Sequence, residues 1–186
     1  MSKDMSIEEL ENSESGGRTP SGIAKIIVTV LLVSWALWQF VAVSPLIEFV
    51  GFSQFSSSVV RPMHLIFAAS LAFLLFPSHK NAPTNRIPIL DWVFAIAAMI
   101  SIGYLIVFKS EIATRLGAPT QFDLMVGAVG MLVLLEATRR ALGLALVVVA
   151  VVLLCFALFR EYMPDILRHE STSFSKLLSH QWFTSE

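Results

Sequence analysis

The chain has 186 residues, of which 55% are hydrophobic and 15% are charged, and its formal net charge is −1. Soluble domains carry about 25% charged residues, so this composition excludes an ordinary soluble protein and predicts a membrane protein. Acidic and basic residues nearly balance, which excludes the basic field that nucleic-acid binding requires, so no nucleic acid is expected as a partner.

Residues 1–22 are predicted to form a disordered, acidic N-terminal tail. They are mostly polar and contain too few apolar residues to build a core. Their acidic residues are Asp4, Glu8, Glu9, Glu11 and Glu14. The first apolar run starts only near residue 23 and does not have the basic start and short apolar run of a secretory signal, so we expect it to stay attached to the chain.

Five apolar runs follow within a predicted transmembrane domain at 23–160. A helix that rises 1.5 Å per residue needs about 20 apolar residues to cross a hydrocarbon core of roughly 30 Å. The runs occupy residues 23–43, 58–76, 90–108, 122–138 and 141–159. We therefore predict an all-α membrane protein with about five transmembrane helices plus amphipathic interfacial helices.

The first run carries polar and aromatic side chains on one helical face. Trp35, Trp38 and Gln39 stand at the spacing i, i+3, i+4, which makes them neighbours on a helix. Two interpretations fit: the three residues contact another helix, or the tryptophans belong to an aromatic belt at the water boundary. The stretch SPLIEFVGFSQF after this run, at 44–55, is read as either a short surface helix or an ordinary loop.

The second and third runs each have charged residues near their start. Arg61 and His64 lie one helical turn apart, and an arginine that extends to the lipid headgroups explains them better than a substrate or proton site. Asp91 lies near the start of the third run and is predicted to cap that helix. An acidic side chain there satisfies free backbone donors and favours the positive end of the helix.

Glu136, Arg139 and Arg140 separate the fourth run from the fifth. A single helix over 122–159 would be about 57 Å long, nearly twice the hydrocarbon thickness. It would also place arginines in mid-bilayer, at about 2.5–3.5 kcal/mol each. We predict two spans joined by a charged turn at the arginines, with one sharply bent helix as the alternative. Glu136 precedes them by three and four residues and can pair with either.

Residues 161–186 are predicted to be an amphipathic C-terminal segment. From residue 173 onward, a helix would share one apolar face among Phe174, Leu177, Leu178 and Trp182. Such a helix lies flat on the membrane or against a partner. Earlier in the chain, the stretch GAVG at 127–130 permits close packing of helices.

The distribution of basic residues indicates an orientation. The double arginine at 139–140 and Lys25, close to a membrane end, favour a cytoplasmic N-terminus under the positive-inside rule. An odd number of spans then places the C-terminus outside.

Motifs for catalysis and cofactor binding are missing from the sequence. There is no H-E-x-x-H, G-x-S-x-G or phosphate-binding G-x-x-x-x-G-K-[ST] pattern, so we do not expect an enzyme or a cofactor bound by this chain. The single cysteine, Cys155, excludes an internal disulfide and a multi-cysteine metal site. Secondary transporters need convergent polar groups near the bilayer midplane, and no run offers them clearly, so a supporting element is expected.

Four stretches together resemble a known family. They are RPMHLIFAASLAFLLFP at 61–77, RIPILDWVFAI at 86–96, RLGAPTQFDLMVGAVGMLVLLEATRRALGLAL at 115–146 and HESTSFSKLLSHQWFTSE at 169–186. In order and spacing they are similar to the N-terminal part of fused permeases of the TRAP (tripartite ATP-independent periplasmic) transporters, TAXI subclass. The fused relatives continue beyond WFTSE, so the chain is either a separate subunit or part of a longer permease.

The resemblance implies a role as the small membrane (Q) component in the bacterial inner membrane. Its partners would be a large membrane (M) component and an extracytoplasmic solute-binding protein, besides the lipid bilayer. The M component would hold the sites for a small organic acid and for the coupling ion, sodium or a proton, and the Q component would support the stationary scaffold. The alternative is a self-sufficient small transporter or channel that uses Arg61, His64 and Glu136 as an ion path.

Overall fold

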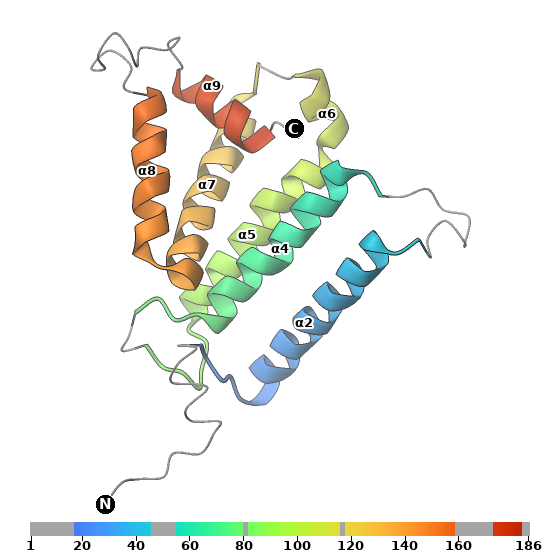
Figure 1. Cartoon of the computed structure of the whole chain (residues 1–186), viewed down its shortest axis with the longest axis vertical. Coiled ribbons are helices and arrows are strands. Elements are labelled where there is room, and N and C mark those ends of the chain that lie inside the picture. The colour runs from blue at the N-terminus through green and yellow to red at the C-terminus, as the bar shows by residue number, and fades with distance from the viewer. Residues whose placement is uncertain (1–16, 46–54, 80–81, 116–117, 159–172, 184–186) are drawn as a thin grey trace, which may run out of the picture.

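The chain is an all-α membrane protein. The computed structural model describes residues 17–45, 55–79, 82–115, 118–158 and 173–183. Helices are the only regular elements among these residues (Figure 1). They are α2 (Gly22–Val43), α4 (Ser57–Leu75), α5 (Ile89–Val107), α6 (Lys109–Thr114), α7 (Gln121–Leu142), α8 (Leu144–Leu158), α9 (Phe174–Leu178) and the π-helical turn η3 (Ser179–Phe183).

Four helices, α2, α4, α5 and α7, are long and apolar enough to cross a membrane. The first three agree with the predicted spans to within one residue at each end. The fifth predicted run also forms a helix, α8, but its 15 described residues fall short of the roughly 20 that a full crossing needs. The chain is therefore a multi-pass membrane protein, with four candidate spanning helices and a shorter fifth apolar helix among the described residues.

The core lies between α4, α5 and α7. Phe73 and Leu74 of α4 and Ala98 of α5 are fully buried there. Small side chains such as Ala69 and Ala95 line the contact, and small residues allow helix backbones to approach closely inside a membrane. Figure 1 shows α4 and α5 side by side along their length.

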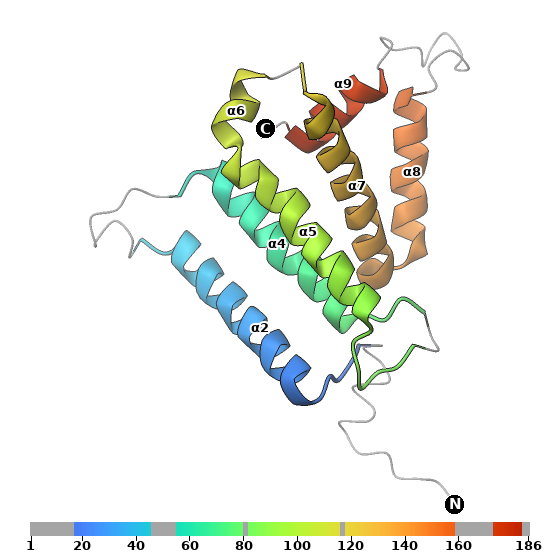
Figure 2. The same ribbon diagram turned by 180° about the vertical axis from the view of Figure 1, so that it is seen from behind.

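The outer helices α2 and α8 lie on opposite sides of this core. In Figure 2, seen from behind, α2 flanks α4 while α8 runs antiparallel beside α7. Val28 is the one buried residue of α2, and none of the described residues of α8 is buried. Both helices are apolar around most of their circumference, as expected of helices that face lipid or other transmembrane helices.

The boundary between α7 and α8 differs from the prediction. The chain breaks at Gly143, three residues beyond the arginines, and Arg139 and Arg140 lie in the last turn of α7. Gly143 has φ 92° and ψ 174°, a conformation open almost solely to glycine. The prediction of two helices is therefore correct, but the turn between them is at Gly143 and not at the arginines. A glycine can reverse the chain in a single residue, so the charged residues remain in the helix.

Part of the predicted N-terminal tail is ordered in the structure. Residues 1–16 lie outside those described, but residues 17–21 are extended and bonded to the rest of the fold. The backbone N–H of Arg18 donates to Leu75 O at 2.6 Å, that of Thr19 to Thr84 O at 3.1 Å and that of Ser21 to Asn85 O at 3.3 Å. Gly22 already begins α2. The prediction of disorder was wrong for residues 17–22, because their partners lie far away in the sequence, at the end of α4 and in the loop after it.

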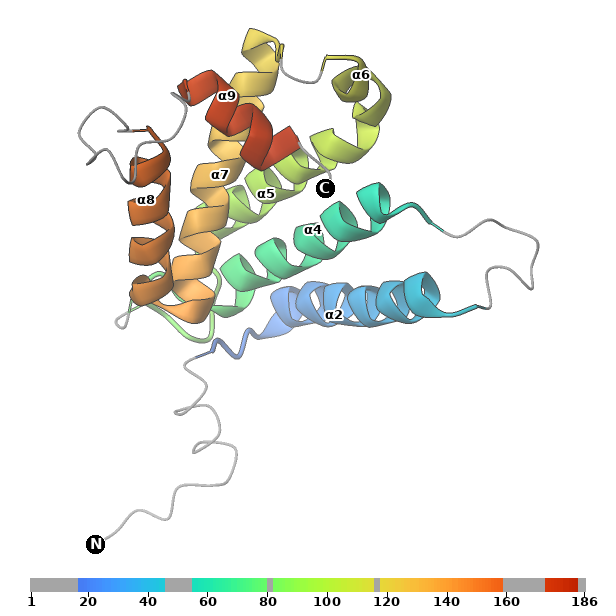
Figure 3. The same cartoon turned by 45° about the horizontal axis from the view of Figure 1, so that its top comes forward.

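The C-terminal segment packs on the same chain. Of the predicted amphipathic segment 161–186, the structure describes residues 173–183, which lie across α7 (Figure 3). Leu177, Leu178 and Trp182 of the predicted apolar face are buried, whereas Phe174 is 57% exposed. The surface that this face covers is therefore α7. The earlier candidate for an interfacial helix, 44–55, falls largely outside the described residues.

Candidate functional site

Five charged side chains meet at the end of the bundle where α4 and α7 end and α5 begins. They are Arg18, Asp91, Glu136, Arg139 and Arg140, and we call them the ionic clasp. The sequence predicted four of them as candidate residues and placed the fifth in a disordered tail. The clasp joins the segment before α2, the first turn of α5 and the last turns of α7.

Asp91 lies at the centre of the ionic clasp. Its two carboxylate oxygens each approach one guanidinium, with Arg18 Nη2 and Arg140 Nη1 both at 2.6 Å. All three side chains are at least 97% buried. Asp91 is in the first turn of α5, as predicted, but Pro88 is the N-cap and no side chain caps the helix. The capping role was wrong, because the carboxylate faces two guanidinium groups and accepts from no backbone N–H at the start of α5.

Glu136 forms the second acidic position of the clasp. It accepts hydrogen bonds from Arg139 at 2.7 and 2.8 Å and from Arg140 Nε at 2.8 Å. The prediction that Glu136 can pair with either arginine is confirmed, and it pairs with both. Arg139 also donates to the carbonyl oxygen of Ser78 at 3.0 Å, which ties α7 to the loop after α4. Glu136 and Arg139 form the more exposed edge of the clasp.

The buried arginines are held by more than charge. The Arg140 guanidinium carbon lies 4.9 Å from the ring centre of Phe73 and 5.5 Å from that of Phe94, and these two rings stack 5.3 Å apart. Arg18 donates to the carbonyl oxygens of Phe73 at 3.2 Å and Pro83 at 3.3 Å. Cation–π contacts and carbonyl acceptors lower the cost of burying a guanidinium. Ion pairs, hydrogen bonds and ring contacts of the clasp thus connect segments that are distant in the sequence.

A second polar cluster occupies the opposite end of the bundle. Asp123, near the start of α7, accepts a hydrogen bond from the Tyr104 hydroxyl and lies 3.5 Å from Arg115 Nη1. Asp123 and Thr120 also form a capping box, with the Thr120 N–H donating at 2.7 Å and the Asp123 N–H at 3.1 Å. One aspartate therefore fixes the start of α7, the end of α5 and the segment after α6.

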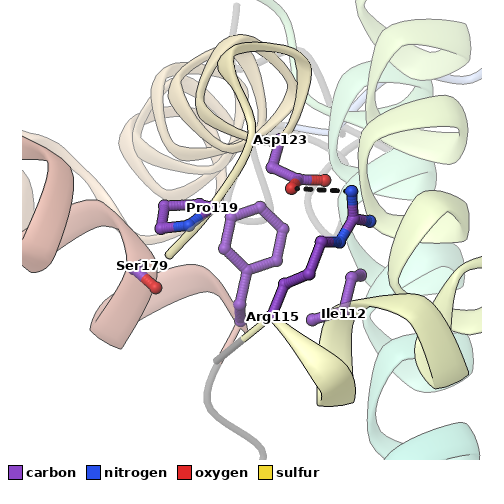
Figure 4. A pocket seen from close by; sticks show the side chains of 6 residues that line it. Ile112, Arg115, Pro119, Asp123 and Ser179 are labelled. Atoms are coloured by element: carbon purple, nitrogen blue, oxygen red, sulfur yellow. Dashed lines mark ion pairs between the residues drawn. The ribbon is translucent and has the colours of Figure 1, made fainter. Parts of the chain in front are cut away.

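A small pocket adjoins this second cluster. Figure 4 shows the Arg115 and Asp123 side chains facing each other across it. The remaining lining comes from α6, the turn before α7 and the C-terminal segment: Ile112, Pro119, Ser179 and Phe183. Because its two charged residues already pair with each other, the pocket is a small gap where these elements meet and not an open anion or cation site.

The polar residues of the first and second spans meet each other. The indole N–H of Trp35 donates to His64 Nδ1 at 3.3 Å, and Gln39 Nε2 contacts the same ring nitrogen. Trp38 packs against Phe55, with ring centres 5.1 Å apart. Arg61 lies exposed on α4, one turn before His64. Of the two interpretations for the first span, contact with another helix therefore holds for Trp35 and Gln39.

Trp182 is held by two glycines of α7. A Cβ atom added to Gly130 would lie 2.1 Å from the Trp182 ring, and one added to Gly127 would lie 3.3 Å from the Leu178 side chain. The indole therefore rests directly on the backbone of α7. The GAVG stretch does permit close packing, as predicted, and the C-terminal segment is the element that uses it.

Sequence reasoning missed Arg18, Tyr104, Arg115 and Asp123 as members of polar clusters. Asp123 had a local signal, because Thr120 and Asp123 match the spacing of a capping box. Arg18 had none, since its carboxylate partner is 73 positions away in the chain. Among the described residues, no group of three or more His, Cys, Asp or Glu side chains is arranged to hold a metal ion.

Comparisons of the chain with family models, with curated proteins and with solved structures gave no match. The arrangement itself shows what the charged residues do. At both ends of the bundle they bind each other and hold segments together.

Proposed function

We propose that this chain is an accessory scaffold subunit of a secondary active transporter of the TRAP type, TAXI subclass. In this proposal it supports a large membrane subunit that takes up small organic acids with a sodium or proton gradient, together with an extracytoplasmic solute-binding protein. The substrate and the coupling ion would bind to the large subunit. The proposal begins from the resemblance of the four sequence stretches given above.

One structural observation supports a scaffold role above the others. The charged side chains of the clasp are closed in ion pairs within the chain, while α2 and α8 present apolar faces outward. A chain whose charged groups bind each other, and whose wide apolar faces remain available, is suited to hold another membrane protein in place.

The alternative of a self-sufficient channel finds less support. Its ion path would need Arg61, His64 and Glu136 to line one route. Arg61 and His64 lie in the first half of α4, whereas Glu136 lies near the end of α7 and is bound to two arginines. These positions are at opposite ends of the bundle, as Figure 1 shows for the two helices.

The proposal includes a location in the bacterial inner membrane with the N-terminus in the cytoplasm. The ionic clasp would then lie at the cytoplasmic end, where lysine and arginine residues accumulate under the positive-inside rule. The second polar cluster and the C-terminal segment would lie at the outer end.

The experiment that tests the proposal identifies what the chain binds in its native membrane. The tagged chain is extracted in mild detergent, and proteins present in stoichiometric amount are identified by mass spectrometry. A large polytopic subunit is the expected result. Isolation of the chain alone and monodisperse, or uptake that continues unchanged after its deletion, would refute a scaffold role.

A further inference from the structure

The polar trio of Trp35, Gln39 and His64 contains a hydrogen-bond donor that has no acceptor among the described residues. The indole N–H of Trp35 can only donate, and it lies 3.3 Å from His64 Nδ1. That nitrogen is therefore the acceptor for Trp35, and the side-chain amide of Gln39 lies against the same nitrogen. A ring whose Nδ1 accepts is neutral and carries its proton on Nε2. The Nε2–H group is the donor left over.

This donor lies on α4, a helix long and apolar enough to cross a membrane. His64 follows the start of α4 by seven residues, or about 10 Å along the helix axis, and Gln39 precedes the end of α2 by four residues, or about 6 Å. His64 is exposed, and among the described residues none accepts a hydrogen bond from its Nε2. A polar group inside a membrane usually faces protein or water, because hydrocarbon leaves it unpaired.

We propose that the face of α2 and α4 that carries Trp35, Gln39 and His64 docks a transmembrane helix of another protein, which presents an oxygen acceptor to His64 Nε2–H. Backbone carbonyls, hydroxyls, amides and carboxylates all supply such an oxygen. Histidine and glutamine side chains commonly join transmembrane helices in this way. The inference rests on the proposed function in one respect, since the large subunit is the chain expected to supply the helix.

The surroundings of the trio favour a helix over a lipid headgroup. Arg61 lies one turn nearer the membrane surface and is exposed, so it is the residue that headgroup phosphates would reach first. His64 lies deeper, between the ring of Trp35, 5.1 Å away edge to face, and the amide of Gln39. α2 buries only Val28 among its own residues, so apolar surface of α2 is available beside the donor.

Two substitutions separate the outward donor from the inward acceptor. In His64→Asn the amide occupies the place of Nδ1, so contacts to Trp35 and Gln39 remain while the outward donor is lost. In His64→Gln the longer amide reaches the place of Nε2 and keeps a donor there. We expect His64→Asn to weaken copurification of the partner about three- to fifteen-fold and His64→Gln to weaken it less. His79→Asn, on a loop histidine that contacts Ser78, is the matched control.

A photo-crosslinking side chain at Val60, one turn before His64, reports what lies on this face in the otherwise native chain. The expected product is an adduct with another membrane protein, and the same probe at Val149 of α8 gives the background of lipid adducts. Adducts with lipid alone, or with a second copy of this chain, would overturn the inference. If the large subunit copurifies equally with wild type and His64→Asn, the inference fails while the proposed function stands. An adduct with an unrelated membrane protein would support the docking face and would count against the proposed function.

Discussion

At the scale of single residues, Asp91 decides which distant segments come together. It binds Arg18 from the segment before α2 and Arg140 from the end of α7, and all three side chains are buried. A buried ion pair contributes little net stability over a well-packed apolar group, because its desolvation is costly. Its contribution to specificity is greater, because an arrangement that separates the buried guanidinium groups from their carboxylate is strongly destabilised. The clasp thus selects one arrangement of the helix ends.

Replacing Asp91 should therefore be severe. In Asp91→Asn, Arg18 and Arg140 would both stay buried, and Arg18 would have no carboxylate. We expect the free energy of unfolding to fall by about 3–5 kcal/mol, the usual cost of breaking a buried pair. Denaturant unfolding in one detergent, followed by tryptophan fluorescence, measures this. Glu111→Gln, an exposed change in α6, is the control, and an equal effect of the two substitutions would contradict the prediction.

Arg18 and Asp91 should be energetically coupled. Arg18→Leu alone leaves Asp91 paired with Arg140, and Glu136 with both remaining arginines, so the clasp becomes neutral. In the Asp91→Asn background, the same substitution removes a buried charge that has lost its partner. We expect Arg18→Leu to cost at least about 1 kcal/mol less there than in the wild type, as directly contacting pairs usually show. Additive effects in this double-mutant cycle would argue against a direct buried pair.

At the scale of elements, the C-terminal segment depends on one missing side chain. Trp182 occupies the space where a Cβ of residue 130 would be, at 2.1 Å. In Gly130→Ala the indole must move, which breaks its contact with α7 and exposes the faces of Leu177 and Leu178. We predict faster proteolytic cleavage between 173 and 183 and a red shift of tryptophan emission.

Gly103→Ala in α5 is the control for that change, because a Cβ there meets nothing within 4 Å. It keeps the same chemistry in another transmembrane helix. If Gly130→Ala and Gly103→Ala gave the same cleavage pattern and the same emission, the C-terminal segment would not depend on the glycine surface of α7.

Some bounds and contacts of the helices could be predicted from the sequence, and others could not. Long apolar runs fixed α2, α4 and α5 to within a residue, because membrane thickness sets helix length. The pairing of Glu136 with its arginines was predictable because three- and four-residue spacings are local geometry. The end of α7 was not predictable, because the charged residues and Gly143 both indicate a turn. In the structure the helix ends at Gly143. Arg18 and Asp91 meet only through tertiary packing, which no local pattern encodes.

At the scale of the whole molecule, the two polar clusters lie at opposite ends of the bundle. The clasp anchors residues 17–21 at the end where α7 finishes. The C-terminal segment packs at the other end of α7, because it rests on Gly127 and Gly130. α7 has 22 residues, or about 33 Å, enough to separate the two ends by a bilayer. Residue 85 and residue 180 should therefore lie on opposite sides.

Single cysteines at these positions test the arrangement. In a Cys155→Ala background, Asn85→Cys marks the clasp end and His180→Cys the end with the C-terminal segment. Because the N-terminus is predicted to be cytoplasmic, a membrane-impermeant maleimide should label His180→Cys in intact spheroplasts and Asn85→Cys only after lysis. Labelling of both cysteines in intact spheroplasts would contradict a bundle that spans the membrane. Labelling of Asn85→Cys alone would keep the bundle and reverse its orientation, placing the ionic clasp on the outer side.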